Sequence, residues 1–263
     1  MIISELFSRA VERDPAGPLL TYYDDAGDER TELSATTLGN WVAKTANLLT
    51  DGLGVDSGAR LAVMLPPHWQ TAGILLGAWA AGHLVVDYPD IDAPPAPDAV
   101  FCTESDLDAY ADLDCDIVGL TLDPWGRGLD AKWRRVTDYA REIGVYGDQF
   151  RAPVAIVDTA PALTAGSLEL TQSGVASAAL ELADRLGMSA GGRIMVSREL
   201  ALTAGPVSWL LAPLAAGSSI VLVTDPGNPR IAARAASEQV TATLGIELAG
   251  IPVLGGQQTE PEV

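Results

Sequence analysis

Apolar residues recur at helical spacing in several stretches of the chain, while elsewhere they form the short continuous runs typical of buried strands. Helical spacing predicts helices over residues 3–13 and 35–52, the second with Ser34 as its N-cap. Between them, the runs LLTYYD and RTEL predict two short strands that flank a turn at Gly27. The amino-terminal region therefore begins as helix, strand, strand, helix.

The clearest unit follows, in which two apolar runs flank a helix rich in small residues. RLAVMLP and HLVVDYP have the pattern of strands buried on both faces, and WQTAGILLGAWAAG lies between them. This order predicts a βαβ crossover with parallel strands. The stretch DYPDIDAPPAPDAV is too rich in Pro and Asp for an element interior, so we expect an exposed connector. AVFCT and DIVGLTLD predict two more strands, and AKWRRVTDYAREIG predicts a helix.

The same alternation recurs after a boundary near residue 150. The strand and loop PALTAGS leads to the helix GVASAALELADRLG, and further strands at RIMVS, SIVLVTD and VTATLG alternate with the helices VSWLLAPLAAG and PRIAARAASEQ. We predict an α/β protein of two flavodoxin-like βαβ subdomains, residues 1–150 and 151–250, with mostly parallel sheets covered by helices. The polar stretch 251–263 predicts a disordered tail.

The charge of the chain limits the classes of partner that it can bind. The 263 residues carry a formal net charge of -19 with only 16 Lys and Arg. Binding to a phosphate backbone depends on such cations, so we expect no nucleic-acid partner. Salt screens the field of the acidic surface over roughly 8 Å, so a locally positive pocket can still bind ATP.

The cysteines and the apolar runs bear on the compartment. Cys102 and Cys115 are the only cysteines, which is typical of a chain from a reducing compartment. The start MIISELFSRAVERD has no signal-peptide pattern, and no apolar run reaches the length of a membrane span. We expect a cytoplasmic protein without a membrane partner.

Three apparent motifs fail on their context. GMSAG, around Ser189, matches a nucleophile elbow, but it follows a helix and precedes a strand, the reverse of what that elbow needs. The acidic run Asp112–Asp116 lacks the glycine and the final Glu of a calcium loop. His68 and His83 have no nearby cluster of metal-ligating residues in sequence. We therefore assign no catalytic and no metal-ligating residue.

One stretch of the chain is compatible with a phosphate-binding loop. LTAGSLELTQSGV, residues 163–175, offers small residues and hydroxyls suited to a phosphate loop, with Thr164, Gly166, Ser167 and Thr171 as candidate nucleotide-binding residues. It has no Lys or Arg, and the next basic residue is Arg185 in the following helix. On these residues alone, a phosphate site and a plain turn are equally good interpretations.

The order of elements resembles the N-terminal part of the adenylate-forming superfamily, which includes acyl-CoA synthetases, peptide-synthetase adenylation domains and firefly luciferase. The most specific block is TELSATTLGNWVAKTANLLTDGLGVDSGARLAVMLPPHWQTAGILLGAWAAGHLVVDYP, and LTQSGVASAALELADRLGMSAGGRIM also contributes. The chain looks most like short relatives within that superfamily. The resemblance implies an acyl or nucleotide ligand and, if any activity is retained, ATP or AMP with Mg²⁺ as cofactors.

The chain departs from this family at the phosphate loop. The family pattern resembles T-S-G-T-T-G-x-P-K-G followed by a T-H pair; Thr164 to Ser167 match its first four positions, and Thr171 with Gln172 matches the pair. The intervening glycine, proline and lysine are missing, and residues 246–263 contain neither the family's Mg²⁺-assisting Glu nor its catalytic lysine.

Three functional hypotheses follow from this departure. The first is a truncated acyl-CoA synthetase-like protein that does not form adenylates alone but retains weak nucleotide or acyl-ligand binding. The second is a non-catalytic interaction module that binds a protein partner or a second copy, with VSWLLAPLAAG as its apolar surface. The third is half of a split ligase that another chain completes.

Overall fold

The computed structural model describes residues 1–86, 95–110, 112–133 and 135–255, which divide into two compact units. Unit 1 contains residues 1–17 and 33–177, and unit 2 contains residues 18–32 together with those from 178 onward. Each unit has its own sheet.

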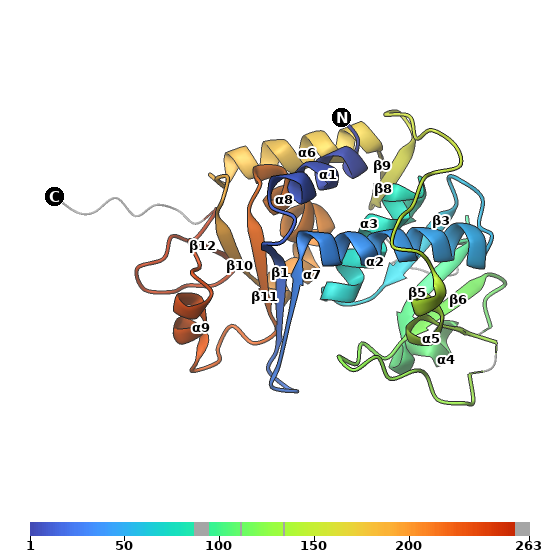
Figure 1. Cartoon of the computed structure of the whole chain (residues 1–263), viewed down its shortest axis with the longest axis horizontal. Coiled ribbons are helices and arrows are strands. Elements are labelled where there is room, and N and C mark those ends of the chain that lie inside the picture. Colours follow the sequence, from blue (N-terminus) through green and yellow to red (C-terminus); the bar gives the residue numbers. More distant parts are fainter. Residues whose placement is uncertain (87–94, 111, 134, 256–263) are drawn as a thin grey trace. The chain divides into compact units, whose positions relative to one another are not determined.

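Unit 1 is built on a mostly parallel sheet that has seven strands among the described residues, in the order β7-β6-β5-β3-β4-β8-β9 (Figure 1). Only the pair β8–β9 is recorded as antiparallel in it. The strands are β3 (Arg60–Met64), β4 (Leu84–Val86), β5 (Ala99–Thr103), β6 (Asp116–Leu120), β7 (Thr137–Asp138), β8 (Pro161–Ala165) and β9 (Leu168–Thr171). The helices are α1 (Ile3–Arg13), α2 (Ala35–Asn47), α3 (Trp69–Ala80), α4 (Leu107–Tyr110), α5 (Tyr139–Glu142) and the start of α6 (Gln172–Arg185).

The helical layer of unit 1 is held by close packing of α2 on α3. Ser34 caps α2 as predicted, because its hydroxyl accepts a hydrogen bond from the backbone N–H of Thr37 at 3.1 Å. Every residue of α3 from Trp69 to Trp79 is buried, so its sequence shows no polar face. A Cβ at Gly77 would lie 2.8 Å from the Cβ of Thr45, which explains a glycine where the two helices approach.

Unit 2 contains a second mostly parallel sheet, in the order β12-β10-β11-β1-β2 among the described residues. Its strands are β1 (Pro18–Asp24), β2 (Glu29–Ser34), β10 (Arg193–Ser197), β11 (Ser219–Val223) and β12 (Ala242–Leu244). Its helices are α7 (Arg198–Pro206), α8 (Ala212–Ala216), α9 (Ile231–Ser237) and the end of α6. A π-helical turn over Val207–Leu211 joins α7 to α8.

The α7–α8 segment, Arg198–Ala216, is long and apolar enough to cross a membrane by length and composition, and it is the one such segment in the described part of the chain. It connects the parallel strands β10 and β11, and Gly205 at φ 72° and ψ 176° interrupts its helical geometry. Trp209, Leu210 and Leu211 are buried in it. These features are those of a kinked crossover helix in an α/β unit.

The predicted fold class is confirmed, but the chain divides elsewhere than at residue 150. Residues 18–32 belong to unit 2 because β1 pairs with β11, with Leu20 opposite Ile220. Residues 151–177 belong to unit 1 because β8 pairs with β4, with Val85 opposite Leu163. Strand pairing between distant segments therefore overrides the sequence order.

The predicted disordered tail, residues 251–263, also begins too early. The backbone N–H of Thr243 donates to Pro252 and that of Leu254 donates to Thr243, and Val253 forms a bridge with Thr243. Ile251–Gly255 is thus an ordered extension beside β12. Residues 256–263 lie outside the described part, as do residues 87–94 of the predicted connector.

Two local predictions were also wrong. The helix expected over residues 131–144 forms only at α5, because Thr137 and Asp138 pair with β6 and the Asp138 carboxylate caps α5 by accepting from Arg141 N–H. The loop expected after PALTA instead turns back at once as strand β9.

Candidate functional site

The candidate phosphate loop is a tight β-hairpin at the edge of the unit 1 sheet. Strand β8 ends at Ala165 and β9 begins at Leu168, so only Gly166 and Ser167 lie between them. Gly166 has a φ of 57°, at the first central position where type II′ hairpin turns favour glycine. Both turn residues are exposed, and Thr164 is half-buried opposite Glu169. The turn has too few residues to wrap around a triphosphate.

Thr171 has a separate role at the start of helix α6. Its hydroxyl accepts a hydrogen bond from Gly174 N–H at 3.1 Å, which caps the helix. The four candidate residues therefore lie in two places: Thr164, Gly166 and Ser167 on the hairpin, and Thr171 at the helix N-terminus that follows it.

Gln172, the first residue of α6, is fully buried, and neither atom of its side-chain amide has a hydrogen-bond partner among the described residues. Its backbone N–H donates to Ala160 at 2.8 Å, so the main chain is satisfied while the side chain is not. Buried polar groups are normally paired, because an unpaired one costs about 1–3 kcal/mol. The family resemblance points to the Thr171–Gln172 pair, whereas the burial of the amide follows from tertiary packing that the local sequence does not indicate.

A comparable arrangement occurs at the start of α3. The His68 ring is buried, and its Nδ1 accepts from Gln70 N–H at 3.2 Å, which makes His68 the N-cap. Gln70 is 5% exposed and its Oε1 has no partner among the described residues. Strands β3 and β8 both run parallel to β4, so their carboxyl ends lie at the same edge of the sheet. At that edge the chain continues from β3 to α3 and from β8 to the hairpin. Ligands of open α/β sheets bind at that edge.

The buried titratable side chains of unit 1 are unsuited to nucleophilic catalysis. Burial raises the pKa of Cys102 to about 12 and that of Cys115 to about 11, and nearby carboxylates add to both shifts. Such thiols stay protonated and unreactive. Burial lowers the pKa of His83 to about 4, with Asp98 opposing the shift only in part.

Ser189 of unit 2 is exposed in the turn before β10, with no base hydrogen-bonded to its hydroxyl in the described residues.

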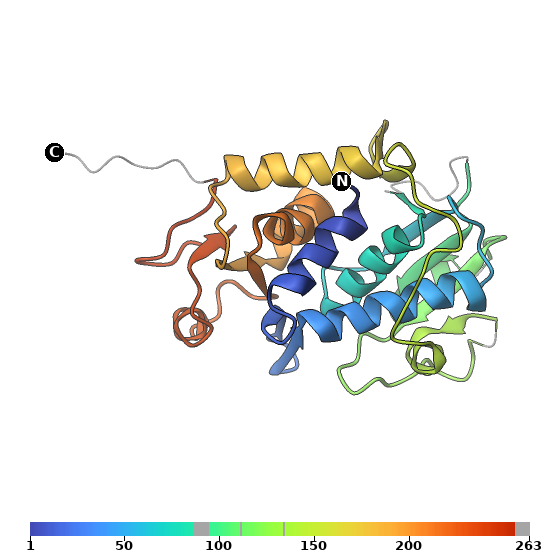
Figure 2. The same ribbon diagram turned by 45° about the horizontal axis from the view of Figure 1, so that its top comes forward.

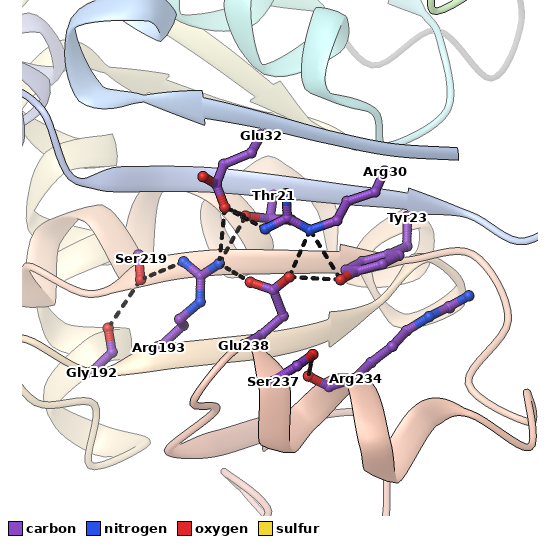
Figure 3. A network of polar contacts seen from close by, with 10 residues as sticks. All are labelled: Thr21, Tyr23, Arg30, Glu32, Gly192, Arg193, Ser219, Arg234, Ser237 and Glu238. Atoms are coloured by element: carbon purple, nitrogen blue, oxygen red, sulfur yellow. Dashed lines mark hydrogen bonds and ion pairs between the residues drawn. The ribbon is translucent and has the colours of Figure 1, made fainter. Parts of the chain in front are cut away.

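Unit 2 has a network of polar side chains on its sheet, centred on Glu238 after α9 (Figure 3). The carboxylate accepts from Tyr23 Oη at 2.6 Å and from Arg30 Nε at 2.8 Å, and it also pairs with Arg193. These hydrogen bonds and the two guanidinium groups outweigh burial and lower the pKa of Glu238 to about 2. Glu32 pairs with Arg30, so the network contains two cations and two anions. The network joins β1, β2, β10 and α9, and its two positive and two negative charges balance, so it has no net charge to attract a ligand.

No group of three or more His, Cys, Asp or Glu side chains that could hold a metal ion occurs in the residues that the structure describes. The acidic run Asp112–Asp116 leads into strand β6 and forms no such group.

The fold is that of the N-terminal part of acyl-CoA synthetases. A fatty acyl-CoA synthetase of Mycobacterium tuberculosis matches with a TM-score of 0.72 over 92% of this chain and 49% of its own, at 14% identity. An acyl-CoA synthetase of Brucella canis matches with a TM-score of 0.73 over 93% of this chain and 47% of its own, at 15% identity. An anthranilate CoA ligase, solved in complex with anthranoyl-AMP, matches at 0.69, over 93% and 49% of the two chains, at 17% identity. The chain thus spans about half the length of these enzymes, and the predicted resemblance in fold is confirmed.

At the level of sequence, no family model matches the chain. A TIGR03089 family protein of Mycobacterium tuberculosis is 41% identical over 244 residues, which cover 88% of this chain and 93% of that protein. The chain belongs to the TIGR03089 family.

Proposed function

We propose that this protein is an acyl-CoA synthetase-like, non-adenylating protein of the cytoplasm that binds a small nucleotide, or the acyl ligand of such enzymes, weakly at the N-terminus of α6. The observation that carries the proposal is Gln172, whose buried amide lies beside the Thr171 cap and has no hydrogen-bond partner within the described part of the chain. A ligand with donor and acceptor atoms would satisfy that amide. ATP or AMP, with Mg²⁺, is the ligand class that the fold favours.

The helix terminus supports the binding of an anion. Backbone N–H groups and the helix dipole favour negative charge there, and α6 has 14 residues. Gly166 and Ser167 lie at the other end of β9 from Thr171, so the hairpin adds no group to this helix terminus. Each charge-assisted hydrogen bond contributes about 1.5–3 kcal/mol, so a site without Lys or Arg is weaker by roughly ten- to a hundredfold.

The same loop argues against adenylate formation by this chain alone. Transfer of the adenylyl group from ATP to a carboxylate, with pyrophosphate as the leaving group, requires charge neutralisation around the triphosphate. The hairpin has two exposed turn residues and no cation, and the next basic residue, Arg185, stands at the opposite end of α6.

Calorimetric titration with Mg-ATP and with AMP tests both parts of the proposal. We expect binding no tighter than about 100 μM, which corresponds to roughly 5.5 kcal/mol, and no pyrophosphate above background with fatty or amino acids and coenzyme A. Gln172→Leu should abolish the binding heat, whereas Ser167→Ala, at the far end of β9, should leave it unchanged. Ser177→Ala, an exposed position on the same helix, is the matched control. Steady pyrophosphate release would contradict the non-adenylating part, and the absence of heat with every ligand would contradict the binding part.

A second candidate function is a protein-interaction module, favoured by Trp125. This side chain is 93% exposed, in a turn where the Asp123 carboxylate accepts from the backbone N–H groups of Trp125 and Arg127. Exposed tryptophans on fixed loops are frequent binding anchors. The surface predicted from VSWLLAPLAAG is not available, because Trp209, Leu210 and Leu211 are buried. Self-association lost in Trp125→Ala, measured by sedimentation, would support this function, and a monomer at high concentration would oppose self-association.

A further inference from the structure

We propose that unit 1 carries a second ligand site, a groove among α1, α2, α3 and the segment 150–156, which binds an unbranched aliphatic chain with an oxygen-containing head group. The groove has a volume of about 400 Å³. All of its lining residues belong to unit 1. Figure 2 shows α1, α2 and α3 side by side, with the olive segment that follows α5 running across α2.

The walls of the groove select an apolar occupant. Ile3 and Phe7 of α1, Val42 of α2, Leu76 of α3 and Ile156 line it, and no charged side chain of the described residues does. Water gains little in such a space because it finds few polar partners. An alkyl chain gains contacts along the walls and leaves water at the same time.

Gly39 keeps the groove open on the α2 side. It lines the groove, and a Cβ built at this position would meet no atom within 4 Å. Glycine costs a helix interior roughly 1 kcal/mol relative to alanine, and no neighbour at this position demands it. A larger side chain at this position would therefore occupy space in the groove.

The wall formed by the segment after α5 is fastened to α2. Lys44 Nζ donates to the Tyr146 carbonyl at 2.6 Å and pairs with the Asp148 carboxylate at 2.9 Å. Asn47 Nδ2 donates to the carbonyl oxygens of Gly147 and Gln149 at 3.0 and 2.9 Å. These contacts position the chain just before Phe150, where the lining begins.

Two hydroxyls supply the polar end of the site. Ser4 and Ser8 lie one helical turn apart on α1 and both line the groove. Neither hydroxyl makes a hydrogen bond recorded among the described residues, so both remain available for an alcohol, ester or carboxylate head group. The volume of the groove is at the low end for small-molecule pockets, which suits one narrow chain. A stable protein interface needs roughly 800 Å² of surface from each partner, which is a much larger contact than a groove of this size offers.

Calorimetric titration with hexan-1-ol, octan-1-ol, decan-1-ol and decanoate tests the proposal, without any nucleotide, so its outcome is independent of the function proposed above. Binding should strengthen about fourfold for each added methylene, and decanoate should bind as well as decan-1-ol does. Gly39→Leu fills the space and should weaken decan-1-ol binding at least tenfold. Ser4→Ala with Ser8→Ala should weaken it about fivefold, the value of one hydrogen bond.

Gly144→Leu is the matched control, because a Cβ at Gly144 also meets no atom within 4 Å and this residue does not line the groove. It should bind decan-1-ol like the unchanged protein. Circular dichroism verifies that both variants fold. If the larger side chain prevents folding, Gly39→Ala replaces Gly39→Leu. The alanine variant should weaken decan-1-ol binding more than hexan-1-ol binding. Unchanged binding in the folded Gly39 variant, or affinity that does not depend on chain length, would overturn the proposal.

Discussion

The imidazole of His83 should make unit 1 less stable as the pH falls below 6.5. The side chain is 1% exposed, and neither ring nitrogen has a hydrogen-bond partner among the described residues. Burial disfavours the charged ring and lowers its pKa from 6.5 to about 4, while the charge of Asp98 and the backbone of Asp56 oppose this only in part. The unfolded chain therefore binds a proton between pH 6.5 and 4 that the folded chain does not.

The size of the effect follows from this difference in pKa. Each pKa unit corresponds to about 1.36 kcal/mol, so the folded state loses roughly 3.4 kcal/mol in all and about 2 kcal/mol by pH 5. The stability is fully present above pH 6.5 and declines as the pH falls toward 4. Losses of this size are a large fraction of the total stability of a domain.

Urea unfolding at pH 7.5, 6.5, 5.5 and 5.0, followed by tryptophan fluorescence, measures this decline. Trp41, Trp69, Trp79, Trp125 and Trp133 lie in unit 1, so the signal reports mainly on that unit. His83→Leu should remove most of the decline and leave stability at pH 7.5 equal or higher, since it replaces an unpaired buried polar group.

His68→Asn is the matched control, because it removes the other imidazole of the chain but keeps an acceptor at the N-cap of α3. It should retain the decline with pH. The reasoning is refuted if His83→Leu shows the same decline as the unchanged protein, or if the unchanged protein is equally stable at pH 7.5 and 5.

Four further outcomes are expected. Glu238→Gln should destabilise unit 2 by about 1.5–3 kcal/mol in chemical denaturation, because a neutral amide loses the charge-assisted hydrogen bonds with Arg30 and Arg193, while Glu32 still pairs with Arg30; in the unchanged protein the carboxylate's contribution is present above pH 4.5 and is lost as the pH falls toward 2. Gly245→Ala should cost about 1–3 kcal/mol in the same assay, since φ is 74° and a Cβ would lie 2.7 Å from Ser197 Oγ. Thr171→Ala should cost about 1 kcal/mol through the lost cap, measured by thermal unfolding, whereas Thr171→Ser should not. Cys102 should resist iodoacetamide in the folded protein and react once urea unfolds it, with mass spectrometry as the readout.

Much of the fold could be predicted because local pattern and burial agree over long stretches. The continuous apolar runs of β3 and β4 with the small residues of α3 indicated the crossover, and Ser34 marked the start of α2. Where a segment is short or polar, this agreement fails. Residues 131–144 have helical spacing, yet Thr137 and Asp138 pair with β6 instead.

The candidate site was predictable only as a stretch of sequence. Small residues and hydroxyls at 164–171 indicated a loop, because hairpin turns and phosphate loops use the same residue types. The structure decides that Gly166 and Ser167 form a two-residue turn and that Thr171 caps a helix. No local pattern indicates that the amide of Gln172 is buried with no partner among the residues that the structure describes, since burial depends on segments far away in the chain.

By itself, the sequence determined the α/β class and the order of most helices and strands, because periodicity and N-caps are local properties. The likeness to the N-terminal part of acyl-CoA synthetases came separately, from the resemblance of particular stretches of the chain to that family. Only the tertiary structure decided that residues 18–32 join the sheet of unit 2, and that Gly39, Ser4 and Ser8 border one groove. Pairing and packing partners are chosen by hydrogen bonds and shape between distant segments, and these interactions exist only once the chain has folded.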